Sequence, residues 1–230
     1  MTTMDGMLVR GVGATAALGL VCVLSSGCVR LTDGTAGLAA AAKPVVLADA
    51  LLDPSRFPAA YPAAVLDEQG TAEAVTGVAG VPAGATVKPP DCAPPPTGSG
   101  PRDAVAAQGV DPATGAALTV ILTRTYDALS VRREELERCP SFTATAGEVV
   151  TTVDTVLLPP PPADADDTLA AESTIRRADG PPVRTLVLTA QLDEVRLTAA
   201  WRNDDPGFEP DSAALDHVFG EALSAMRGAR

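Results

Sequence analysis

The sequence of 230 residues has one histidine, His217, and few of the groups that catalysis requires. A Ser-His-Asp or Cys-His site needs its histidine beside its partners, but helical periodicity places His217 opposite the apolar stripe of the last predicted helix. We therefore expect His217 to be an exposed surface residue. Nucleotide-binding loops, CxxC pairs and HExxH motifs do not occur. The sequence predicts no catalytic residues, no cofactor and no metal, so we expect a protein that is not an enzyme.

The acidic residues do not change this expectation. Residues 164–167 and 204–211 are rich in Asp and Glu, but neither segment has the spacing of an EF-hand loop or a glycine at its sixth position. We interpret both segments as solvated loops rather than calcium sites.

Lysine is also scarce, since Lys43 and Lys88 stand against fifteen arginines. This Ala- and Arg-rich, Lys-poor usage is typical of a GC-rich genome, such as that of an actinobacterium. The net charge is −12 and the sequence pI is about 4.4. A body this acidic repels nucleic-acid phosphates and gains nothing from an anionic lipid surface. The charge therefore argues against a nucleic-acid partner, and any membrane attachment needs another cause.

The N-terminus has the pattern of an export signal. Arg10 precedes an apolar run over 11–24, which ends in Ser25-Ser-Gly-Cys28. The segment Leu24-Ser-Ser-Gly-Cys28 resembles a bacterial lipobox, except that Ser25 stands where an aliphatic residue is usual. We interpret 1–27 as a signal peptide, Cys28 as the site of lipidation (palmitate) and 28–44 as a flexible tether. The predicted location is the extracytoplasmic face of the cell membrane.

Two other outcomes are open at this segment. Ser25 and Gly27 also fit an ordinary cleavage site, which would release a soluble protein. The uncharged run over 11–29 is near the lower length limit for an uncleaved membrane anchor.

The four cysteines have separate predicted roles. Cys22 lies inside the export segment, and Cys28 is the lipidation candidate. Cys92 and Cys139 remain as a single pair in an oxidising compartment, so we predict a disulfide bond between them. Two buried free thiols are the alternative, whereas a metal site would need more Cys or His neighbours.

Residues 45–230 predict a single α+β domain, an antiparallel β-meander with helices packed on one face. The clearest pattern is period-2 alternation over 186–192 and again over 195–201, with a turn between them. Residues 212–227 carry an apolar stripe that predicts an amphipathic C-terminal helix, capped by Asp211. Further strands are expected at 117–125, 148–158 and 169–178. Helices are expected at 48–52, 71–78 and 126–138, and extended polyproline geometry at 89–96.

Several segments carry a family resemblance. They are Leu51-Leu-Asp-Pro-Ser-Arg-Phe-Pro58, Pro-Pro-Asp-Cys92-Ala-Pro-Pro, Glu137-Arg-Cys139-Pro-Ser-Phe142, Leu157-Leu-Pro-Pro-Pro-Pro162 and the terminal helix. Over roughly 45–228 the chain resembles mycobacterial lipoproteins of unknown function of the DUF5642 kind. These are similar to the extracellular sensor domain of PknH-type kinases. The resemblance implies an antiparallel sheet with helices forming a cleft, and a sensor or ligand-binding role. The sensor domain has two disulfides, whereas this sequence can form one, and no ligand-binding residues are implied.

Two functions are therefore expected from the sequence. The first is a non-catalytic, membrane-anchored lipoprotein that binds or senses a small apolar or cell-wall ligand. The second is an accessory protein that docks on another protein of the cell envelope. An apolar cavity would favour the first function, and a flat exposed apolar patch would favour the second.

Overall fold

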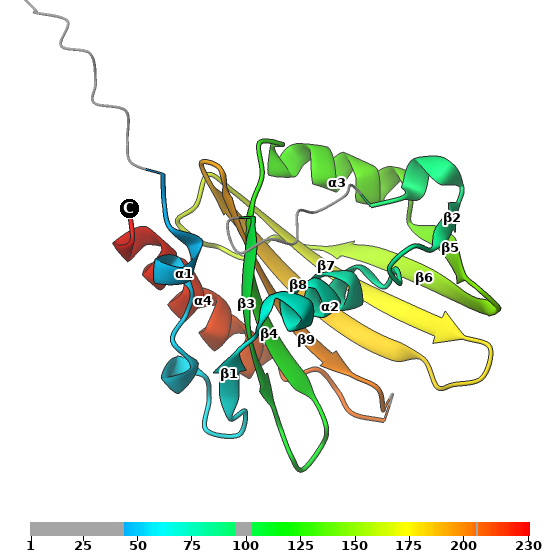
Figure 1. Cartoon of the computed structure of the whole chain (residues 1–230), viewed down its shortest axis with the longest axis horizontal. Coiled ribbons are helices and arrows are strands. Elements are labelled where there is room, and N and C mark those ends of the chain that lie inside the picture. Colours follow the sequence, from blue (N-terminus) through cyan, green and yellow to red (C-terminus); the bar gives the residue numbers. More distant parts are fainter. Residues whose placement is uncertain (1–43, 95–102, 206) are drawn as a thin grey trace, which may run out of the picture. The chain divides into compact units, whose positions relative to one another are not determined.

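The computed structural model describes residues 44–94, 103–205 and 207–230 (Figure 1). The predicted signal peptide, Cys28 and nearly all of the predicted tether lie outside these residues. The described residues belong to one compact unit. None of the helices in the described ranges is long and apolar enough to cross a membrane.

An antiparallel sheet of nine strands dominates the domain and confirms the predicted α+β class (Figure 1). Its order is β1-β3-β4-β9-β8-β7-β6-β5-β2. The strands are β1 (Ala63–Val65), β2 (Thr86–Lys88), β3 (Ala104–Val110), β4 (Ala117–Arg124), β5 (Ser141–Ala146), β6 (Val149–Leu158), β7 (Asp167–Arg177), β8 (Val183–Leu192) and β9 (Val195–Asn203). The helices are α1 (Leu47–Ala50), α2 (Glu68–Ala79), α3 (Leu129–Arg138) and α4 (Ser212–Gly228), with 3₁₀ turns at Pro54–Arg56 and Pro90–Cys92.

Strands β8 and β9 form the hairpin that the alternating pattern predicts. Leu186 pairs with Trp201, and Leu188 pairs with Ala199, so these four side chains share one face of the sheet. Asp193 adopts a positive φ of 50° in the two-residue turn, which short polar side chains tolerate better than most.

Helix α4 covers this face and seals the main core. Asp211 caps it by accepting a hydrogen bond from the Ala214 amide at 3.0 Å. The helix buries its whole predicted stripe, namely Leu215, Val218, Phe219, Ala222, Leu223 and Met226. These side chains form one apolar cluster with Leu118, Val120, Leu122, Leu197, Trp201 and residues of α1. This face is therefore the closed core of the domain.

Helices also lie over the opposite face, which extends the predicted arrangement of helices on one face only. Gly77 of α2 lies beside the guanidinium of Arg202, and Gly80, just after α2, lies against Val153 and Ile175. These three side chains alternate away from the α4 face. Helix α3 lies over β6 and β7 on the same side (Figure 1). The sheet is consequently sandwiched between α1 and α4 on one side and α2 and α3 on the other.

Four local expectations need correction. Helix α3 begins at Leu129 and not at Tyr126 as expected, so Tyr126 belongs to the preceding loop and is 87% exposed. The alternation over 117–125 predicts a half-buried strand, but β4 is buried on both faces, including Thr119 and Ile121, because α2 covers the second face. Residues 90–92 form a 3₁₀ turn instead of continuous polyproline structure. Strands β1, β2, β3 and β5 were not predicted at all.

Candidate functional site: a cleft between the sheet and two helices

A cleft lies on the sheet face opposite α4. Its volume is about 190 Å³, and it is bounded by strands β4 to β9 below and by α2, α3 and Pro94 around it. Helix α2 is the reason that space remains there. Only Thr71 of its twelve residues is fully buried, because the helix is short of large apolar side chains. The helix therefore spans this face of the sheet without filling the space beneath it.

The walls of the cleft are mainly aliphatic. Val153, Leu169 and Ile121 are buried in its floor. Val75 and Val78 of α2, Leu136 of α3, Phe142 of β5 and Val187 of β8 are only half-buried and border the open space. On the α4 face, by contrast, the large side chains are closed against each other. Incompletely buried apolar side chains that converge on one cavity are typical of a ligand site.

Hydroxyl groups break up this apolar floor. The lining includes Thr123, Thr155, Ser173, Thr189 and Thr198. Thr155 and Ser173 satisfy one another across neighbouring strands, with 3.0 Å between their hydroxyl oxygens. The site thus combines an apolar body with a few polar groups that can orient a ligand.

Among the described residues, two arginines supply the charged side chains of the lining, Arg132 from α3 and Arg196 from β9. Strand register places Arg196 between Thr123 of β4 and Gln191 of β8. Its Nη2 donates to the Asp127 carbonyl at 2.8 Å and to Gln191 Oε1 at 3.1 Å. Gln191 in turn donates from Nε2 to the same carbonyl at 3.1 Å. These bonds anchor one edge of the guanidinium to the loop that precedes α3.

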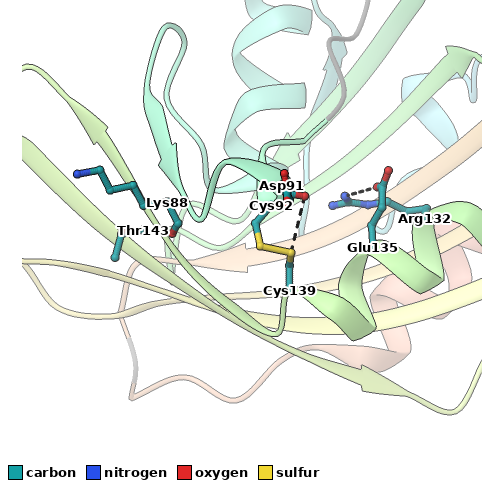
Figure 2. The surroundings of a disulfide bond; sticks show 7 residues. All are labelled: Lys88, Asp91, Cys92, Arg132, Glu135, Cys139 and Thr143. Atoms are coloured by element: carbon teal, nitrogen blue, oxygen red, sulfur yellow. Dashed lines mark hydrogen bonds and ion pairs between the residues drawn. A yellow bond between two sulfur atoms is a disulfide. The ribbon is translucent and has the colours of Figure 1, made fainter.

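The electrostatic surroundings of Arg196 disfavour its charge. Burial lowers the pKa of the Arg196 guanidinium, the positive charge of Arg132 lowers it further, and the carboxylates of Asp127 and Glu135 oppose this shift. Arg132 itself is paired with Glu135 one turn along α3, at 3.1 Å (Figure 2). The cleft is therefore a locally positive site in a protein of net charge −12.

The predicted disulfide bond between Cys92 and Cys139 is present (Figure 2). Cys139 follows the last turn of α3, and Cys92 ends the 3₁₀ turn at Pro90–Cys92. The two Cα atoms are 5.6 Å apart, within the usual range. Both cysteines line a small hollow of about 20 Å³ that shares Pro94 and Leu136 with the cleft. The bond thus ties two walls of the cleft together at one end.

An ion pair holds α3 to the sheet beside the same cleft. Arg133 Nη2 donates to Asp167 Oδ1 at 2.9 Å and to the Thr168 carbonyl at 2.8 Å. The hydrogen bond from Arg133 is the main cause of a lowered pKa of Asp167. Helix α3 is consequently fixed by a covalent bond after its last turn and by an ion pair from its middle.

Other residues considered in the sequence lie away from the cleft. His217 is exposed on α4, as predicted, on the far side of the sheet. Within the described ranges, no group of three or more His, Cys, Asp or Glu side chains could hold a metal ion. The sequence did not single out Arg196 as a site residue. Its only signal was a long cationic side chain alternating with apolar residues along a strand.

The fold and the cleft define the class, an α+β domain with a locally positive cleft on one sheet face. No protein-family model matches the chain, and no curated protein matches it. The resemblance to lipoproteins of the DUF5642 kind therefore stays a prediction.

Two solved structures are similar in fold. One is an uncharacterised protein (Rv0999 ortholog) from Mycobacterium smegmatis, with 14% identity, a TM-score of 0.44, and coverage of 75% of this chain and 92% of that one. The other is the extracellular domain of PknH from Mycobacterium tuberculosis, with 11% identity, a TM-score of 0.44, and coverage of 72% and 98%.

Proposed function

We propose that this protein is an exported, lipid-anchored binding protein that holds a small ligand in the cleft between the sheet and helices α2 and α3. The cleft itself carries the proposal, because half-buried apolar side chains from two helices and two strands border it. The disulfide bond supports an extracytoplasmic location, since such bonds persist in oxidising compartments. The lipobox-like segment ending at Cys28 supports attachment to the membrane. The role is binding or sensing, without catalysis.

Docking on another envelope protein is the second candidate from the sequence. The exposed large apolar residues of the described ranges are Val46, Val65, Val110, Tyr126, Val131, Val149, Val150, Val156 and Phe208. They are spread over strands, loops and α3, and single exposed apolar residues are common on soluble proteins. The cleft is the stronger feature, so ligand binding is the better-supported function.

The experiment is native mass spectrometry of the protein purified from its own cells, with two matched variants. Val187→Phe places a larger side chain in the cleft, whereas Val156→Phe makes the same change at a residue that is 63% exposed on β6. We expect a stoichiometric small molecule on the wild type and on Val156→Phe, but not on Val187→Phe. Circular dichroism checks that both variants are folded. Absence of a small molecule from all three proteins would overturn the proposal, and a stoichiometric protein partner in its place would favour docking.

A further inference from the structure

Arg196 in the cleft has neither of the two things that stabilise the charge of the other described arginines, which are a carboxylate partner and full exposure to water. Nine of the twelve arginines in the described ranges form ion pairs with carboxylates. The other three are Arg138, Arg177 and Arg196. Arg138 and Arg177 are exposed, so water solvates them, whereas Arg196 is half-buried. Arg196 is thus the one arginine of the described part of the chain that is withdrawn from solvent without a carboxylate.

The hydrogen bonds of the individual nitrogen atoms also show that the Arg196 guanidinium is incompletely paired. Nη2 has two acceptors, but Nε is buried and has no hydrogen-bond partner among the described residues. A charged group taken out of water without a partner costs free energy, and native proteins normally pair such groups. The positive charge of Arg132 opposes that of Arg196, and the carboxylates of Asp127 and Glu135 favour it without forming an ion pair with it. The buried Nε has no acceptor, and no carboxylate of the described residues forms an ion pair with Arg196, so the guanidinium is suited to an anionic acceptor from outside the described part of the chain.

The rest of the cleft limits what that anion can be. Beyond the guanidinium, the lining is aliphatic or hydroxylic, which suits a hydrocarbon body and not a highly charged one. An apolar cavity of roughly 150 Å³ is known to accept benzene. A cleft of about 190 Å³ accepts a body of that size with a small polar group at one end.

From these observations we infer that the ligand is a small organic acid with an apolar body of benzene-like size, whose carboxylate pairs with Arg196. The planar guanidinium matches a carboxylate well, because its donors can bond both oxygens. The apolar body would lie against Ile121, Leu169 and Val187. The second arginine, Arg132, adds positive charge but already has Glu135 as a partner. This inference rests on the proposed function and names the chemistry of its ligand.

The test compares four probes on the purified protein by NMR titration. Benzoate, benzyl alcohol and benzylamine share one ring and differ in charge, and acetate has the carboxylate without the ring. We expect benzoate to bind about tenfold to a hundredfold more tightly than benzyl alcohol, as one or two charge-assisted hydrogen bonds allow. Benzylamine and acetate should bind more weakly than either. The methyl signals of Ile121 and Val187 should shift on addition of benzoate.

Two variants locate the effect. Arg196→Gln should weaken benzoate binding about tenfold or more, while leaving benzyl alcohol within about twofold. Arg202→Gln is the matched control, because Arg202 lies on the same face of the same strand but outside the cleft and is paired with Asp204 at 2.9 Å. We expect it to leave both affinities unchanged. The wild-type comparison of probes still decides the question if Arg196→Gln does not fold.

The outcomes separate the inference from the function on which it rests. Equal affinities for benzoate and benzyl alcohol, or a benzoate affinity that Arg196→Gln leaves unchanged, would overturn the role of the carboxylate while the cleft remained a binding site. Acetate binding as tightly as benzoate would overturn the role of the apolar body. If no probe binds at millimolar concentration, the inferred ligand class is wrong, and mass spectrometry of the native protein separately decides whether the cleft holds a ligand.

Discussion

The disulfide bond between Cys92 and Cys139 should contribute a large share of the stability of the domain. The bond closes a loop with a sequence separation of 47 residues. The chain-entropy relation for a loop of that length gives a stabilisation of about 4 kcal/mol at 25 °C. Single domains are usually stable by only about 5–15 kcal/mol. We therefore expect the Cys92→Ala/Cys139→Ala double variant to be marginally stable.

Urea denaturation followed by circular dichroism measures this loss. With a slope of about 2 kcal/mol per molar urea, the midpoint of the double variant should lie about 2 M below that of the wild type. Dithiothreitol should lower the wild-type midpoint to a similar value and leave the double variant unchanged, which controls for side-chain truncation at the half-buried Cys92 and the buried Cys139. A midpoint that falls by less than about 0.5 M would refute the entropic reasoning.

Three further variants test the packing of the core, the ion pair between Arg133 and Asp167 that holds α3, and the predicted lipid anchor at Cys28. Phe219→Ala should destabilise the domain by about 3–5 kcal/mol, because Phe219 on the buried face of α4 is only 4% exposed. His217→Ala changes an exposed residue of the same helix and should cost under about 0.5 kcal/mol in the same urea experiment. Asp167→Asn should lower the urea midpoint by more at pH 7 than at pH 3. The hydrogen bond from Arg133 holds the pKa of Asp167 below its ordinary value of 3.8, so the carboxylate stabilises the fold above that pH and loses its contribution as the pH falls through the lowered pKa. An equal difference at both pH values would contradict this assignment. Cys28→Ala should abolish lipid labelling and move the protein from the membrane to the soluble fraction, and persistent labelling would exclude Cys28 as the modified residue.

Much of the sheet and its sealed face could be predicted from the sequence. Large apolar residues alternate over β8 and β9, so Leu188 and Trp201 indicate both the strands and the side that they bury. Helix α4 has a continuous apolar stripe and an aspartate cap, which makes its position and its packing predictable. The cysteine pair was predictable for a different reason, because elimination left only two candidates.

The unpredicted strands have weak or irregular composition. Strand β3 consists of Ala, Val, Gln and Gly, so no alternation of large apolar residues indicates it. Its Gly109 lies so close to Tyr61 that an added Cβ would be 2.6 Å from the Tyr61 carbonyl oxygen. Strands β1 and β2 have three residues each and exist only because a neighbouring strand pairs with them.

The cleft could not be predicted because it forms between the outward, polar face of the sheet and the helices that cover that face. The sequence shows Arg196 and Thr198 alternating outward along β9, which resembles an ordinary solvated surface. In the structure, α2 and α3 lie above this surface, held by tertiary contacts that are distant in sequence. Periodicity reports which side chains share a face, but not whether that face meets water or a weakly apolar helix.

The two three-residue strands at the ends of the sheet affect how copies of the domain behave when crowded. An unpaired strand edge offers backbone donors and acceptors to any second chain, which is how many β-rich proteins aggregate. Here β1 follows Pro62, and β2 ends with the exposed Lys88 immediately before Pro89. Short length, proline and a charged side chain all discourage addition of a tenth strand. These edges disfavour edge-to-edge growth although the sheet is not closed into a barrel, so we expect a partner protein to bind a face of the sheet rather than to extend it.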